Sequence, residues 1–144
     1  MIRKATPEDL NIVTTLALKL WPGHDDAELK EEMGELLRQP DAAVFLCFRE
    51  EAPGGFAQCQ LRRDYVEGTS SSPVGYLEGI FVDTPFRGQG AARKLLDACE
   101  SWAREQGCRE FASDCELENQ GSLSFHLATG FEEANRIICF TKKL

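Results

Sequence analysis

Residues 74–98 read VGYLEGIFVDTPFRGQGAARKLLDA. The first nine of them are rich in β-branched and aromatic types, and they predict a strand. After a turn that contains Pro85, the period changes at Gly90, because Ala91, Leu95 and Trp102 recur at helical spacing. The segment therefore predicts a strand, a glycine-containing turn and the first turn of a long helix.

The start of this helix predicts an anion site. The backbone amides of a first helical turn have no partner inside the helix. Gly88 and Gly90 carry no side chain that would keep a ligand away, and Arg87 adds a full positive charge to that of the helix dipole. A phosphate or pyrophosphate fits such a site. The P-loop pattern is absent, and Arg93 stands where a dinucleotide fingerprint needs a small residue.

The pattern Arg87-x-x-Gly90-x-Ala92 resembles the pyrophosphate loop of the GCN5-related N-acetyltransferases (GNAT). The resemblance implies a GNAT fold, an α/β mixed central sheet with splayed middle strands and flanking helices. It also implies acetyl-coenzyme A (acetyl-CoA) as cosubstrate, with no metal. The residues that it assigns to the coenzyme are Ile80, Phe81, Val82, Arg87, Gly88, Gln89, Gly90, Ala91, Ala92, Arg93 and Asn119.

A second motif, Asn119-x6-His126-x3-Gly130-Phe131, resembles the closing motif of the same superfamily, in which many members carry Tyr in place of His126. Nearly the whole chain is also similar to the small aminoglycoside 6'-N-acetyltransferases, which implies an antibiotic-resistance enzyme and a homodimer. The stretches that carry this resemblance are Leu20–His24, Tyr65–Gly68, Ser72–Ile80, Phe111–Asp114 and Phe140–Lys143.

Length and charge narrow the possibilities. A chain of 144 residues has the size of one domain, so we expect a single domain over residues 1–144. The formal net charge of −8 argues against a nucleic-acid partner and suits a polycationic substrate. No apolar run could span a membrane, and no signal-peptide core follows Met1, so we expect a cytoplasmic protein with no membrane partner. The six cysteines show no metal-binding spacing.

The whole pattern predicts an α/β domain around a mixed sheet whose early strands are antiparallel. Thr6 is the expected N-cap of the first helix, with Asp9 as its capping acid. Residues 65–73 form a polar loop that we expect over the site. The expected strands are 2–4, 43–48, 56–63, 74–82, 108–114, 132–137 and 138–141, and the expected helices are 7–20, 26–37, 90–106 and 116–128.

Two carboxylates are the candidates for chemistry. Strand alternation predicts one face with Tyr76, Glu78, Ile80 and Val82, and the other with Leu77, Gly79 and Phe81. Glu78 is either a solvent-facing strand residue or a functional acid, and Gly79 after it predicts a bulge or a close ligand approach. Asp114 is either a turn cap or the second functional acid. The resemblance implies that both flank the reacting amine, bind ammonium groups and supply a proton acceptor.

Aromatic and polar side chains near these acids are expected to bind the sugar. Trp21, His24 and Tyr65 are the candidates, although Trp21 could equally be a core residue and His24 could cap a helix end. His126 is either a helix-face residue or the acid that protonates the leaving thiolate. Asn135 stands near a position where some relatives have an acid.

The sequence therefore predicts an acetyl-CoA-dependent N-acetyltransferase that acts on the 6'-amine of aminoglycosides by direct attack in a ternary complex. One alternative keeps the chemistry and changes the acceptor to a polyamine, another small molecule or a protein amine. The other alternative is a catalytically silent CoA-binding module.

Overall fold

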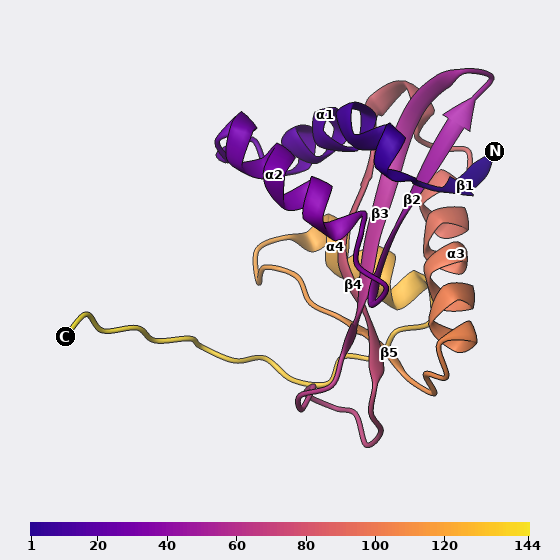
Figure 1. Ribbon diagram of the computed structural model, residues 1–144. Helices are drawn as coiled ribbons and strands as arrows, with labels where there is room; N and C mark the ends of the chain where they lie inside the picture. The colour runs from indigo at the N-terminus through magenta and orange to yellow at the C-terminus, as the bar shows by residue number, and fades with distance from the viewer.

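Five strands form one mixed sheet in the computed structural model, which describes residues 1–144 (Figure 1). The strands lie in chain order; β1 to β4 are antiparallel neighbours, and β5 runs parallel to β4. Helices cover both faces of the sheet. The elements are β1 (Ile2–Lys4), η1 (Pro7–Asp9), α1 (Leu10–Leu20), α2 (Asp26–Leu36), β2 (Ala42–Arg49), β3 (Ala52–Arg62), β4 (Val74–Val82), η2 (Thr84–Phe86), α3 (Ala91–Glu105), β5 (Phe111–Ser113) and α4 (Gln120–Ala128).

The predicted cap at the first helix forms, and Arg3 joins it as a partner that the sequence did not indicate. The Thr6 amide donates a hydrogen bond to Asp9 Oδ2 at 2.8 Å, and the Arg3 guanidinium donates to both Asp9 oxygens at 2.8 Å. These donors, Arg3 first, lower the pKa of the buried Asp9 carboxyl to about 2. The ion pair thereby ties β1 to the start of α1.

Two apolar clusters define the two faces of the sheet. On the first, which we call the α1/α2 face, Val13, Leu16, Leu29 and Met33 pack against Val44, Leu46 and Phe56. On the second, the α3 face, Leu95, Leu96, Cys99 and Trp102 pack against Ala57, Cys59 and Leu77. Burial of these side chains is the main favourable contribution to folding.

The middle strands splay, as the fold class requires. β5 pairs with β4 only from Gly75 to Leu77, opposite Phe111 to Ser113, whereas β4 continues to Val82. Beyond Leu77 the backbone groups on this edge of β4 have no β5 partner. The splay thus leaves unpaired backbone groups between the two strands.

A β-bulge in β4 confirms one prediction and overturns another. Gln58 pairs with Gly79 and Cys59 pairs with Leu77, so Glu78 is an extra residue on β4. Beyond an extra residue the alternation of faces shifts by one position. Ile80 and Val82 accordingly pack on the α3 face with Leu77, and Phe81 packs on the α1/α2 face. The predicted grouping of Ile80 and Val82 with Tyr76 and Glu78 is wrong, and so is that of Phe81 with Leu77.

The two final strands predicted at 132–137 and 138–141 do not form. Residues 131–144 have no regular structure, and Figure 1 shows this segment running away from the body of the protein. Its start touches the 65–73 loop, where Asn135 donates to Glu67 at 3.1 Å. A strand needs a neighbouring strand for its backbone groups, and one chain supplies none here.

Smaller differences concern element ends. β3 begins at Ala52 rather than 56, β5 begins at Phe111 rather than 108, and α4 begins at Gln120 rather than 116. None of the helices has the length and apolar character that crossing a membrane would need.

Candidate active site

The loop before α3 has the backbone that an anion site needs. Gly88 and Gly90 have φ of +79° and +77°, in the left-handed region that favours glycine. Gly90 is the N-cap of α3, and no side chain caps the helix. The amides of the first turn therefore lack an intramolecular partner. A Cβ at either glycine would meet nothing within 4 Å, so the space in front of these amides is open.

A cavity of about 270 Å³ lies at this helix start. Arg93 Nη2 donates to the Ala128 carbonyl at 2.8 Å and so links α3 to α4 across the cavity. Arg87 is held through its Nε, which donates to the Val82 carbonyl at 2.7 Å, so its outer nitrogens stay free for an anion. The predicted coenzyme residues among those that line the cavity are Val82, Arg87, Gly88, Gly90, Ala91, Ala92 and Arg93.

Four predicted coenzyme residues lie outside this cavity. Ile80 and Phe81 belong to the β4 stretch that has no β5 partner. Gln89 lies in the loop between the two glycines. Asn119 has a structural task, because its Oδ1 accepts the Ser122 amide at 3.0 Å and caps α4.

Glu78 lies in a half-buried ion pair that the sequence did not indicate. Arg62 Nε and Nη2 donate to its two carboxylate oxygens at 3.0 and 2.8 Å. The Glu78 side chain is 16% exposed and that of Arg62 39%. The hydrogen bond to Glu78 raises the pKa of Arg62, so the guanidinium remains charged.

Asp114 is linked to the same group of side chains through Tyr76. The Tyr76 hydroxyl donates to Asp114 Oδ2, and the Arg62 guanidinium lies 3.4 Å from the centre of the Tyr76 ring. Burial and the Asp114 carboxylate raise the pKa of Tyr76, so the phenol keeps its proton. The structure thus connects the two predicted acids, Glu78 and Asp114, through two residues that the sequence interpretation missed.

Trp21 lies beside the bulge. A Cβ at Gly79 would come within 2.7 and 2.9 Å of the Trp21 ring, so Gly79 makes room for this indole. The ring also packs edge-on against buried Phe56, at 6.1 Å between centroids, which gives Trp21 part of the core role weighed above. His24 lies 6.2 Å from Trp21, ring to ring. Tyr65 is 77% exposed, at the start of the 65–73 loop.

His126 makes specific contacts with β5. Its Nδ1 lies 2.7 Å from the Ser122 carbonyl, which can only accept, so Nδ1 carries a proton. Its Nε2 lies 2.8 Å from Ser113 Oγ. Phe111 packs on the α3 face, and alternation puts Ser113 on the same side, opposite to Asp114. His126 and the carboxylates therefore lie on opposite sides of the gap between β4 and β5.

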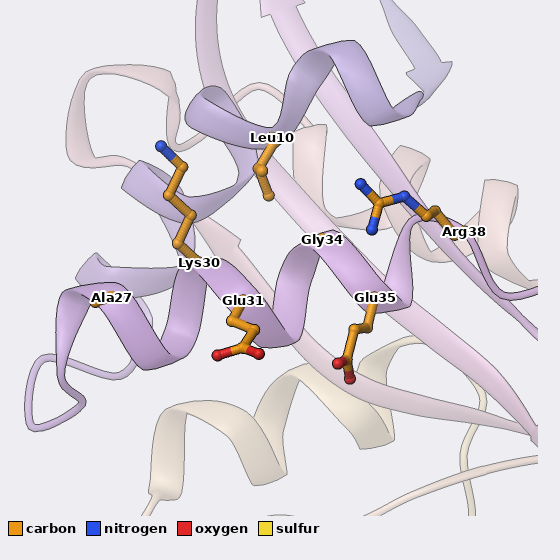
Figure 2. A pocket seen from close by; sticks show the side chains of 7 residues that line it. All are labelled: Leu10, Ala27, Lys30, Glu31, Gly34, Glu35 and Arg38. Carbon is orange, nitrogen blue, oxygen red and sulfur yellow. The ribbon is translucent and has the colours of Figure 1, made fainter.

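A second cavity lies away from this site. It measures about 440 Å³ and lies between α1 and α2 (Figure 2). Its lining contains none of the predicted site residues, and Figure 2 shows the carboxylates of Glu31 and Glu35 pointing away from Leu10. No group of His, Cys, Asp and Glu side chains in the structure could hold a metal ion. The chemistry-bearing residues gather instead around β4.

Gly90→Asp is expected to weaken binding of coenzyme A at least tenfold. The substitution adds a negative charge and a side chain in front of the free amides, and one lost charge-assisted hydrogen bond is worth roughly 1.5–3 kcal/mol. Isothermal titration calorimetry measures the dissociation constant. Gly107→Asp is the matched control, because Gly107 has φ of +90° and open space at the other end of α3. Unchanged affinity in a folded Gly90→Asp protein would refute the pyrophosphate assignment.

Comparison with known proteins shows the family of the chain. Residues 10–131 match the model of the Acetyltransferase (GNAT) family. The chain is 45% identical to an aminoglycoside N(6')-acetyltransferase type 1 of Stenotrophomonas maltophilia, covering 99% of this chain and 93% of that protein. It is 44% identical to the protein of the same name in Salmonella typhimurium (strain LT2), covering 99% and 98%.

Solved structures of similar proteins have the same fold. AAC(6')-Iy in complex with the bisubstrate analog CoA-S-monomethyl-acetylneamine superposes with a TM-score of 0.96 at 40% identity, covering 100% of this chain and 98% of that chain. AAC(6')-Ih from Acinetobacter baumannii superposes with a TM-score of 0.92 at 36% identity, with the same coverage of each.

Proposed function

This chain belongs to the acetyltransferase (GNAT) family, and we propose that it transfers the acetyl group of acetyl-CoA to the 6'-amine of aminoglycosides. The observation that supports an amine as the acceptor is the connected pair of carboxylates, Glu78 and Asp114, where β4 and β5 separate. Relatives that match over nearly the whole chain bear the name of this activity. The cytoplasm, where acetyl-CoA is made, is the proposed compartment.

In the proposed reaction the two substrates meet in the gap between β4 and β5. The free amides at the start of α3 and Arg87 hold the pyrophosphate of the coenzyme. The neutral amine attacks the thioester carbonyl carbon, the carbon–sulfur bond breaks, and the sulfur leaves as the coenzyme thiolate. The new amide nitrogen releases one further proton, which balances the proton that the thiolate takes up to become the thiol. Backbone amides on the unpaired edge of β4, at Ile80 and Val82, stabilise the negative charge that develops on the carbonyl oxygen.

Protons move on both sides of this gap. On the α1/α2 face an ammonium group binds Asp114 and Glu78, and one carboxylate accepts the proton that the amine must lose before attack. On the opposite side the Ser113–His126 pair is the candidate to protonate the leaving thiolate. Trp21, His24 and Tyr65 are proposed to contact the sugar rings.

The aminoglycoside assignment is tested by thiol release from acetyl-CoA against a panel of amines. We expect turnover with kanamycin-type drugs that have a 6'-amine, and none with analogues that lack it. Turnover of a polyamine or a protein amine alone would contradict the assignment and favour the alternative acceptors. Coenzyme binding without thiol release with any amine would favour the silent module.

We propose, in addition, that the protein is a homodimer joined through residues 131–144. In this segment Ile137, Ile138 and Phe140 are 72%, 81% and 88% exposed, although the sequence there has strand-forming character. Apolar side chains gathered in the open mark an interaction surface. A second copy of the chain supplies the neighbouring strand that one copy lacks.

Light scattering after size exclusion measures the dimer directly. We expect about 32 kDa, twice the 16.1 kDa of one chain, for the parent protein. The double variant Ile138→Asp, Phe140→Asp should give the monomer mass, because two charges enter the buried surface. Leu117→Asp, at an exposed leucine outside the segment, is the matched control and should stay dimeric. A monomeric parent protein would end this proposal.

A further inference from the structure

Arg62 has two partners, Glu78 and Tyr76, in the middle of the proposed acceptor site, and no role has been assigned to it. It is the last residue of β3, and its guanidinium donates to both oxygens of Glu78 at 3.0 and 2.8 Å. The flat side of the guanidinium lies 3.4 Å from the centre of the Tyr76 ring. A planar cation held edge-on by a carboxylate and face-on by a ring has little freedom to rotate.

Tyr76 extends this arrangement to Asp114. Its ring is buried, with 6% of its surface exposed, and its hydroxyl donates to Asp114 Oδ2. The order Glu78–Arg62–Tyr76–Asp114 therefore links β3, β4 and β5 by side chains. A shift of the guanidinium would disturb both carboxylates, directly at Glu78 and through the tyrosine ring at Asp114.

The two hydrogen bonds from Arg62 leave Glu78 able to bind a second cation. Each carboxylate oxygen has two lone-pair sites, and Arg62 occupies one site on each oxygen. Asp114 Oδ1 receives no hydrogen bond from the protein. Since Arg62 balances the charge of Glu78, the four groups together carry one net negative charge. That balance suits a single alkylammonium group.

We propose that Arg62 is the positioning residue of the acceptor site. It sets the plane of the Glu78 carboxylate and, through Tyr76, the place of Asp114, so that both acids face one primary amine of the substrate. It does so without contacting the reacting atoms. The inference rests on the proposed function insofar as the acceptor is an amine bound by these two acids.

Arg62→Lys tests the paired hydrogen bonds to Glu78, because lysine keeps the charge but cannot donate two parallel hydrogen bonds. We expect kcat/KM for the acceptor to fall roughly 10- to 100-fold, as for a small misplacement of a reacting group, with KM for acetyl-CoA unchanged within about twofold. Arg63→Lys is the matched control, since the neighbouring arginine pairs with exposed Asp41 at 2.7 Å and is expected to behave as the parent.

A double-mutant cycle with Glu78→Gln separates positioning from general stability. If Arg62 acts through Glu78, Arg62→Lys should lower kcat/KM by a smaller factor in the Glu78→Gln background than in the parent, because only the route through Tyr76 to Asp114 remains. Equal effects in both backgrounds, or an Arg62→Lys enzyme as active as the parent, would overturn the proposal.

A crystal structure of the Arg62→Lys protein gives a measurement independent of turnover. A Glu78 carboxylate rotated from its parent orientation supports the proposal, and an unmoved carboxylate refutes it. If the parent acetylates another amine instead of aminoglycosides, the cycle is run with that amine. Failure of the aminoglycoside assignment and failure of the Arg62 role therefore give different results.

Discussion

Replacing Glu78 by glutamine is expected to lower kcat/KM for the acceptor amine by roughly 10²–10⁴-fold, the usual cost of losing a general base. The amide keeps the shape of the side chain but can neither take a proton nor balance the charge of Arg62. The Arg62 side chain is 39% exposed, so water can solvate it and the fold should survive. We expect kcat to fall and the acidic limb of the pH–rate profile to move.

Asp114→Asn should have a different kinetic signature. Asp114 is exposed, and the Tyr76 hydroxyl can still donate to the amide oxygen of asparagine. The variant therefore loses mainly a charge that attracts the ammonium. We expect a higher KM for the drug with kcat close to that of the parent, because only binding common to ground and transition states is removed.

Steady-state kinetics with a 6'-amino drug distinguishes these outcomes. Glu32→Gln is the matched control, because Glu32 is an exposed acid on α2 that makes no hydrogen bond in the structure. If Glu78→Gln and Asp114→Asn both keep full kcat/KM for every aminoglycoside, neither residue is in the site. The acceptor assignment would then fall with them.

The sequence alone was sufficient to predict the strand and the helix that surround these acids. Alternation and helical spacing located the β4 strand and the α3 helix, because each rests on contacts local in sequence. The glycine pair before α3 was recognisable for the same reason, since a left-handed backbone favours glycine whatever packs around it. The cap formed by Thr6 and Asp9 is equally local.

The geometry of the acceptor site could not be predicted from the sequence alone. Gly79 suggested a bulge, but the extra residue is defined by the pairing of β4 with β3, which a single strand does not reveal. The Arg62–Glu78 contact likewise depends on the register of two strands. The missing strands after α4 show the same limit, because apolar residues such as Ile137 and Phe140 indicate a strand but not whether a neighbouring strand is there to pair with it.

Gly79→Val is expected to destabilise the protein by about 1–3 kcal/mol, the usual cost of overpacking. The first added carbon would lie 2.7 Å from the Trp21 ring and 3.2 Å from Leu20. Gly79 is not among the glycines with left-handed φ, so its backbone accepts a side chain and the penalty is steric. Trp21 cannot simply retreat, because it packs against Phe56, which has no exposed surface.

The displacement of Trp21 should be measurable in Tm, in tryptophan fluorescence and in the kinetics. For a chain of this size 1 kcal/mol shifts Tm by roughly 2–4 °C, so Tm should fall by about 2–12 °C. Tryptophan fluorescence should change, since the second tryptophan, Trp102, is buried on the α3 face and stays in place. KM for the drug should rise while KM for acetyl-CoA stays constant, because the coenzyme cavity has no contact with Trp21.

Gly34→Ala is the matched control for this substitution. A Cβ at Gly34 would lie 3.7 Å from Leu10, an ordinary contact, and alanine favours the helix there. Its Tm should equal or exceed that of the parent. If the Gly79→Val protein has the same Tm and the same KM for the drug as the parent, the α1/β4 junction tolerates a side chain. Trp21 would then have to be removed from the proposed acceptor site.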